Sequence, residues 1–68
     1  MTMVFRAECA VLLKLNDIET TTRMQVTVEA WKPADAIPKA KAKAKAEFKE
    51  FKAKVARVTV DNLVKIRD

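Results

Sequence analysis

The residues with the clearest capacity for chemistry in this chain are lysines that recur at helical spacing. Four of them stand three or four positions apart, at Lys41, Lys45, Lys49 and Lys52. On a helix they would project along one flank, and we call these four residues the basic ridge. An ammonium group attracts phosphates and carboxylates, but it lacks the planar donor geometry by which arginine reads bases. The ridge therefore predicts electrostatic docking of low sequence specificity.

The whole net charge of the chain lies in the stretch that contains this ridge. The net charge is +5, and the stretch from Lys32 to Lys54 holds eight lysines against three acidic residues, which accounts for all of it. A nucleic-acid backbone and an acidic protein surface are both suitable partners. Lysine and alanine are also strong helix formers, so a purely solubilising helix face is the third interpretation.

A second group of candidate contact residues comes from the predicted strands. By alternation, the face of the sheet without the helix carries Trp31, Arg23, Arg57, Leu12 and Leu63. A tryptophan can stack on an unpaired base, although sheets that stack bases usually present two or three aromatic residues. Contact in a homodimer or packing over the strand ends are the other interpretations, and the two leucines favour them.

The residues of a catalytic or metal site are not visible. The chain has no His, Gly or Tyr, so it has neither an imidazole base nor a glycine-rich phosphate loop. The single cysteine, Cys9, falls on the apolar side of a predicted strand, where a thiol is a small inert hydrophobe. Glu8 and Glu29 are expected to pair with arginines across the sheet rather than to act as acid and base. We predict a protein that is not an enzyme and binds no cofactor or metal.

Three strands are expected to carry the sheet residues. Alternation of apolar and polar side chains predicts strands over about 4–15, 21–31 and 55–67. A turn at Asn16–Glu19 joins the first two, because Asn and Asp tolerate left-handed backbone geometry. The alternation of the last strand breaks at Asp61-Asn62, which indicates either a bulge or a separate fourth strand.

A single long helix is expected to carry the basic ridge. Asp35 is the predicted N-cap, and Pro33 and Pro38 are compatible with a helix start. The helix then runs over about 35–54. Its apolar stripe is Ile37, Ala40, Ala44, Phe48 and Phe51, extended by Val55.

The order β-β-α-β restricts the topology. A right-handed crossover makes the third strand parallel to the second, which leaves the slot between them to the apolar first strand, antiparallel to both. The chain is therefore predicted to be a single α+β domain over residues 1–68. It is a two-layer ββαβ fold, in which a three-stranded antiparallel sheet of order 2-1-3 carries one helix on one face.

Size and composition set the expected context. A chain of 68 residues buries only about 60% of its unfolded surface, so self-association as a homodimer is expected. No apolar run approaches the roughly 20 residues of a membrane span. Arg6 and Glu8 interrupt the N-terminal apolar stretch, which argues against a signal peptide. We expect a cytoplasmic protein that does not bind membranes.

The layout of the chain resembles a loose class of small proteins. A strand ending Val26-Thr27-Val28-Glu29-Ala30, an alanine-rich helix started by Pro and Asp, and a closing strand with Val58-Thr59-Val60 look like many small phage- and mobile-element-encoded proteins. Some anti-CRISPR inhibitors of similar size are among them. The resemblance is architectural, and it implies a protein that acts by binding host nucleoprotein machinery.

The expected function follows from this resemblance and from the charge. We expect an accessory or inhibitor protein that docks on a host protein or nucleoprotein complex through the basic ridge, the open sheet face, or both. Low-specificity binding of DNA or RNA by the lysine-rich helix is the alternative.

Overall fold

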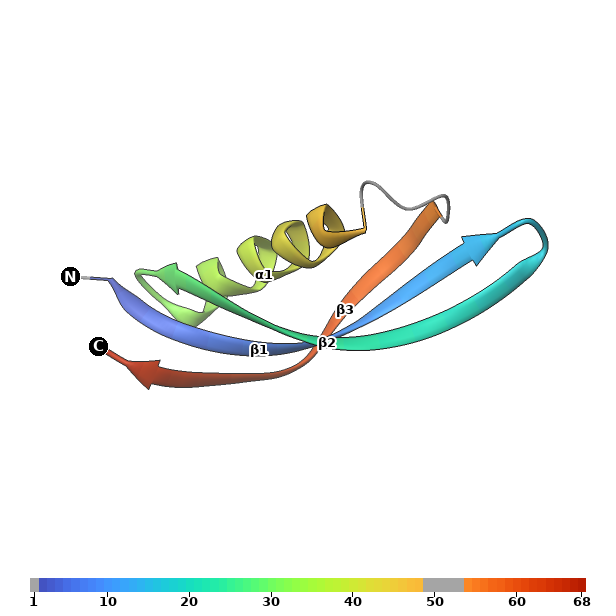
Figure 1. Cartoon of the computed structure of the whole chain (residues 1–68). Coiled ribbons are helices and arrows are strands. Elements are labelled where there is room, and N and C mark those ends of the chain that lie inside the picture. The colour runs from blue at the N-terminus through green and yellow to red at the C-terminus, as the bar shows by residue number, and fades with distance from the viewer. Residues whose placement is uncertain (1, 49–53) are drawn as a thin grey trace.

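The fold is a three-stranded sheet covered on one face by a helix (Figure 1), as a computed structural model that describes residues 2–48 and 54–68 shows. The elements are β1 (Met3–Leu15), β2 (Ile18–Ala30), α1 (Pro33–Glu47) and β3 (Lys54–Arg67). The sheet order is β2-β1-β3, and the central β1 is antiparallel to both neighbours. The predicted α+β architecture and strand order are confirmed.

β1 and β2 form a hairpin that is paired along its whole length. Leu15 pairs with Ile18, so only Asn16 and Asp17 form the turn. Asn16 has a positive φ of 57°, a left-handed conformation that Asn adopts at lower cost than most residues. β2 therefore begins three residues before the predicted 21, because backbone pairing continues to the turn whatever the side-chain pattern. Trp31, predicted inside the strand, lies just after its end.

The helix begins earlier than the sequence predicts. Lys32 is the N-cap, and its carbonyl oxygen accepts hydrogen bonds from the N–H groups of Asp35 and Ala36 at 3.1 and 3.3 Å. Pro33 occupies the first helical position, where its missing N–H costs no hydrogen bond. Asp35 is thus not the N-cap but a first-turn residue, whose carboxylate interacts favourably with the helix dipole. The helix cannot reach the predicted residue 54, since Lys54 already belongs to β3.

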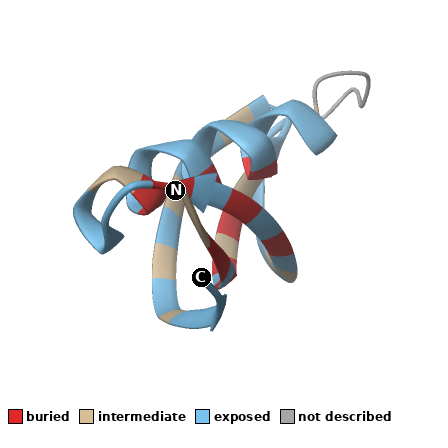
Figure 2. Cartoon of the chain, turned by 90° about the vertical axis from the view of Figure 1, so that its left-hand side faces the viewer, coloured by how far each residue is buried: buried red, intermediate tan, exposed pale blue. Residues whose placement is uncertain are grey.

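The hydrophobic core lies between α1 and the sheet, as the burial colours show (Figure 2). The helix contributes three alanines at a spacing of four, Ala36, Ala40 and Ala44, all without exposed surface. The half-buried Phe48 continues this stripe. Ala40 and Ala44 were predicted there. Ile37 was also predicted in the core but is exposed, because one step of 100° from Ala36 turns it toward solvent. The buried sheet residues of this core are Phe5, Ala7, Cys9, Val11, Val26, Val28 and Ala30.

β3 is one continuous strand with three irregularities in its pairing to β1. The register skips one β3 residue at each of them, namely Ala56, Asp61 and Ile66. Each skipped residue is a bulge, and it reverses the face to which the following side chains point. The predicted irregularity at Asp61-Asn62 is therefore a bulge, and a separate fourth strand does not form.

The bulges change which β3 residues reach the core. Leu63 packs against the core, whereas simple alternation placed it on the open face. Conversely Ala56, Val64 and Ile66, which simple alternation places on the side opposite Arg57 and so toward the helix, are exposed. Val55, Val58 and Val60 join Leu63 against the core. Regular alternation fails here because the strand contains three extra residues.

Candidate functional site

The two flanks of α1 face the two edges of the sheet, and their lysines make different contacts. On the β2 side, Lys39 Nζ donates a hydrogen bond to the carbonyl oxygen of Glu29 at 2.9 Å, and Lys43 Nζ donates one to that of Thr27 at 2.6 Å. Four residues of helix rise about 6.0 Å and two residues of strand about 6.6 Å. This match allows two lysines one turn apart to reach alternate carbonyls of the edge strand. Both lysines are therefore occupied in covering the free edge of β2.

The other flank of α1 leaves a hollow beside β3. The hollow has a volume of about 230 Å³, and we call it the β3 hollow. Its lining consists of Lys41, Ala42, Lys45, Val55, Ala56, Arg57 and Val58. Two lysines of the predicted basic ridge thus stand at this hollow, while Lys49 and Lys52 lie outside the described residues. None of its described lining residues is acidic.

Arg57 belongs to both of the surfaces that the sequence predicts, the open sheet face and the basic side of the helix. It was predicted on the open sheet face, and its pairing partner on β1 is Leu12. It also lines the β3 hollow beside Lys41 and Lys45. The structure therefore brings together three predicted site residues from the helix and β3 around one small surface.

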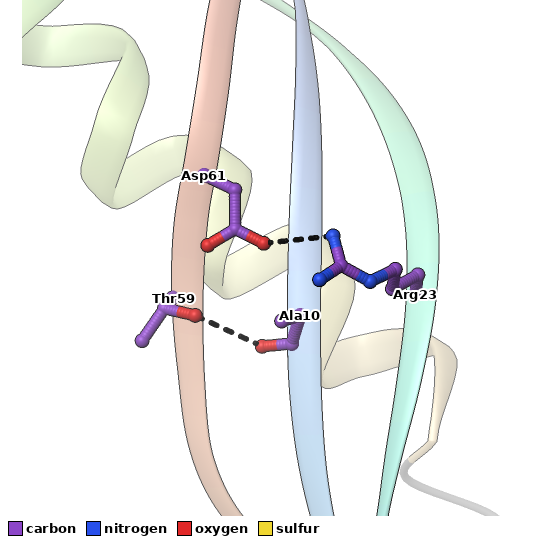
Figure 3. Close-up of polar contacts among 4 residues, drawn as sticks. All are labelled: Ala10, Arg23, Thr59 and Asp61. Atoms are coloured by element: carbon purple, nitrogen blue, oxygen red, sulfur yellow. Dashed lines mark hydrogen bonds and ion pairs between the residues drawn. The ribbon is translucent and has the colours of Figure 1, made fainter.

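Arg23, another predicted site residue, is paired with an acid (Figure 3). Its Nη1 lies 3.3 Å from Oδ2 of Asp61, across the central strand at Ala10. The Thr59 hydroxyl donates a hydrogen bond of 3.5 Å to the Ala10 carbonyl oxygen next to this ion pair. Because Asp61 is a bulge residue, its side chain can reach over β1 instead of following the ladder. An exposed pair of this kind contributes only about 0–1 kcal/mol, but it balances the charge of Arg23.

The apolar residues predicted on the open face do not form one surface. Leu63 faces the core, as described above. Trp31 is 65% exposed and follows Ala30, which pairs with Met3. Leu12 lies nine residues farther along β1 from that end, about 30 Å away. The predicted contact face of Trp31, Leu12 and Leu63 is therefore not assembled within one protomer.

Two cations that were not predicted as site residues extend the basic surface. Lys14 and Lys54 pair directly across β1 and β3, one step along the strands from Leu13 and Val55. Like charges in such a position repel each other, so this pair does not stabilise the sheet. Only the register reveals it, because the two lysines are far apart in sequence. The cationic region thus continues from the β3 hollow toward the turn of the hairpin.

The acidic residues form no constellation for acid–base or metal chemistry within residues 2–48 and 54–68. No group of three or more His, Cys, Asp or Glu in this part of the chain is placed to hold a metal ion. The residues directly opposite Glu8 are Gln25 and Asn62, not the arginine that was expected there, and Arg23 lies diagonally across from it. In the same part of the chain, no helix has the length and apolar character that crossing a membrane requires.

Cys9 is buried in the core, and burial raises the pKa of its thiol, with a further rise from the negative charge of Asp61. The thiol therefore stays protonated and shielded near about pH 8. We expect iodoacetamide to leave Cys9 unmodified in the folded protein and to alkylate it in urea, as measured by mass spectrometry. Rapid alkylation of the folded chain, at the rate of the unfolded one, would contradict this placement.

Comparison of the chain with known protein families, with curated proteins and with solved structures found no match.

Proposed function

We propose that this chain is a non-enzymatic binding protein that docks on an acidic surface of a protein partner through the β3 hollow. In the biological role that we propose, it is a small accessory or inhibitor protein of phage or mobile-element type. Its partner is then a host protein or a nucleoprotein complex.

The observation that carries this proposal is the contrast between the two flanks of α1. Lys39 and Lys43 donate hydrogen bonds to the protein's own backbone, whereas Lys41 and Lys45 stand with Arg57 at a hollow that no described acidic residue lines. A solubilising helix would need no such division. Three cations from two elements, α1 and β3, converge on one surface, and convergence of this kind favours a bound anionic group.

The lining of the β3 hollow favours a polypeptide over a nucleic acid. Between its cations it exposes alanine and valine, and its lining within residues 2–48 and 54–68 includes no aromatic side chain. Bases of a single strand bind by stacking on aromatic rings, and base edges are read chiefly by arginine, of which the lining has one. A polypeptide that carries carboxylates among small apolar side chains matches this lining better than a nucleic acid does. Binding to a phosphate backbone is the alternative that the experiment must separate.

The experiment is affinity capture from host lysate, with and without nuclease, using the unchanged protein and a variant carrying Lys41→Glu and Lys45→Glu. We expect the unchanged protein to retain an acidic protein after nuclease treatment and the variant to lose it. The captured protein is then purified and its affinity measured. Because the contacts are ionic, we expect that affinity to fall when salt is raised from about 50 to about 200 mM.

A matched control distinguishes the effect of losing the lysines at the β3 hollow from the effect of changing the net charge. Lys32→Glu with Arg67→Glu changes the net charge equally, and both residues are exposed at the far end of the sheet. This control should capture the partner as the unchanged protein does. Equal loss in both variants would show that only net charge matters. Capture that disappears with nuclease would assign the surface to nucleic acid instead.

A further inference from the structure

The two outer edges of the sheet differ in how their backbone groups are covered. An edge strand exposes unpaired N–H and C=O groups, which are a template for pairing with another strand. On β2, the carbonyl groups of Thr27 and Glu29 are already bonded to Lys43 and Lys39. On β3, no hydrogen bond from a described side chain reaches the backbone. The β3 hollow lies beside this edge instead.

A short part of β3 has the regular geometry that strand pairing needs. The bulges at Ala56 and Asp61 enclose four residues, Arg57–Val60, which pair with β1 without irregularity. In an antiparallel ladder the backbone groups of successive residues point alternately to the two sides. Two of these four residues therefore direct their N–H and C=O groups to the outer edge. The bulges on either side limit pairing to this stretch, because they interrupt the ladder.

We infer that the partner binds as an extended acidic segment that adds as a fourth strand to the outer edge of β3 at Arg57–Val60. This inference rests on the proposed function, since it names the form in which the acidic partner enters the β3 hollow. Backbone hydrogen bonds to β3 hold the segment in register. Its carboxylates on the helix side then lie against Lys41 and Lys45, which flank the same hollow.

A second copy of this chain is a poor occupant of the same edge. Pairing of β3 with β3 of another copy would place the lysines of both hollows, Lys41 and Lys45, along one seam, together with Arg57 of each chain. Like charges brought together in this way disfavour the pair. An acidic strand is instead attracted to this edge, because its negative charges complement the positive charges of the hollow. Charge therefore selects a foreign acidic strand over self-pairing.

The test uses synthetic peptides and the whole folded protein. The probe is a short peptide that alternates Glu and Val, which favours an extended strand with all carboxylates on one face. Its control has the same sequence with N-methyl groups on alternate residues, which block backbone hydrogen bonding along one edge and leave the charge unchanged. Affinity is measured by calorimetry, and binding is mapped by amide hydrogen exchange.

We expect the unmethylated peptide to bind about tenfold or more tightly than its methylated control, since the control loses hydrogen bonds to β3. We also expect it to slow exchange of the outward amides within Arg57–Val60, with no change at Thr27 and Glu29. Equal affinity of the two peptides with no new protection in β3 would overturn strand addition while leaving charge docking intact. If neither peptide binds at low salt and Lys41→Glu with Lys45→Glu does not alter capture of the natural partner, the proposed function fails as well.

Discussion

Replacing Ala40 with leucine is expected to lower the free energy of unfolding by about 1–3 kcal/mol, because the site has no room for a larger side chain. Ala40 has no exposed surface and lies in the middle of the row Ala36, Ala40 and Ala44 that faces the sheet. Small residues in this row let the helix backbone approach the strands closely. A domain of this size has only about 3–5 kcal/mol to lose, so the variant should be largely unfolded at moderate urea concentrations.

The matched control for this substitution is Ala46→Leu on the same helix. Ala46 is exposed, and leucine is nearly as good a helix former as alanine, so the control should change stability by less than about 0.5 kcal/mol. Urea unfolding followed by circular dichroism measures both variants. If Ala40→Leu were as stable as the control, the helix would have to lie farther from the sheet than the buried alanines indicate.

The sequence was sufficient to predict that the helix packs on the sheet, but not to predict the rotation of the helix about its own axis. Ala40 and Ala44 could be assigned to the core because a helical period joins them to later apolar residues. The same period also allowed Ile37 to be assigned to the core, and Ile37 is larger and more apolar than Ala36. The structure buries Ala36 instead, because close approach of the helix backbone favours small side chains over more apolar ones. The space available to a side chain between the helix and the strands, and not its hydrophobicity alone, therefore decides which helix residues are buried.

The faces of β3 could not be predicted from alternation. A bulge leaves no reliable mark on a sequence of valines, threonines and charged residues, yet it reverses the direction of every following side chain. The irregularity at Asp61-Asn62 was visible because Asn62 interrupts the apolar parity. Those at Ala56 and Ile66 were not, because both residues fit an apolar alternation. Leu63 was therefore assigned to the wrong face, and the open-face contact surface that included it is not formed.

The candidate site was predicted in part, and the missing part concerns the position of the helix across the sheet. Helical spacing separated Lys41 and Lys45 from Lys39 and Lys43 correctly. It could not show that the latter pair would bond to carbonyls of β2, which requires the helix to lie within reach of that edge. Nor could it show that Arg57 would line the same hollow as Lys41 and Lys45, since that depends on how β3 lies beside the helix.

Two double substitutions on one helix should separate these roles. Lys39→Met with Lys43→Met keeps the long apolar stems but removes both hydrogen bonds to β2. We expect this variant to self-associate, because the uncovered edge of β2 becomes available for strand pairing. Its mass, measured by light scattering, should be larger than that of the unchanged protein and should increase with protein concentration. Binding to an acidic partner should persist, since Lys41 and Lys45 are intact.

Lys41→Met with Lys45→Met removes the same charge from the same helix and is the matched control. It should keep the mass of the unchanged protein, because Arg57 still opposes self-pairing at the edge of β3 and the bulges limit pairing there to four residues. It should bind an acidic partner at least about tenfold more weakly. A rise in mass for both variants would show that net charge, and not the cover over β2, prevents association. A loss of binding in both would mean that the two flanks act as one diffuse field. Opposite outcomes would establish that alternate lysines of one tract serve different purposes, one pair closing an edge of the sheet and the other leaving an edge open to a partner.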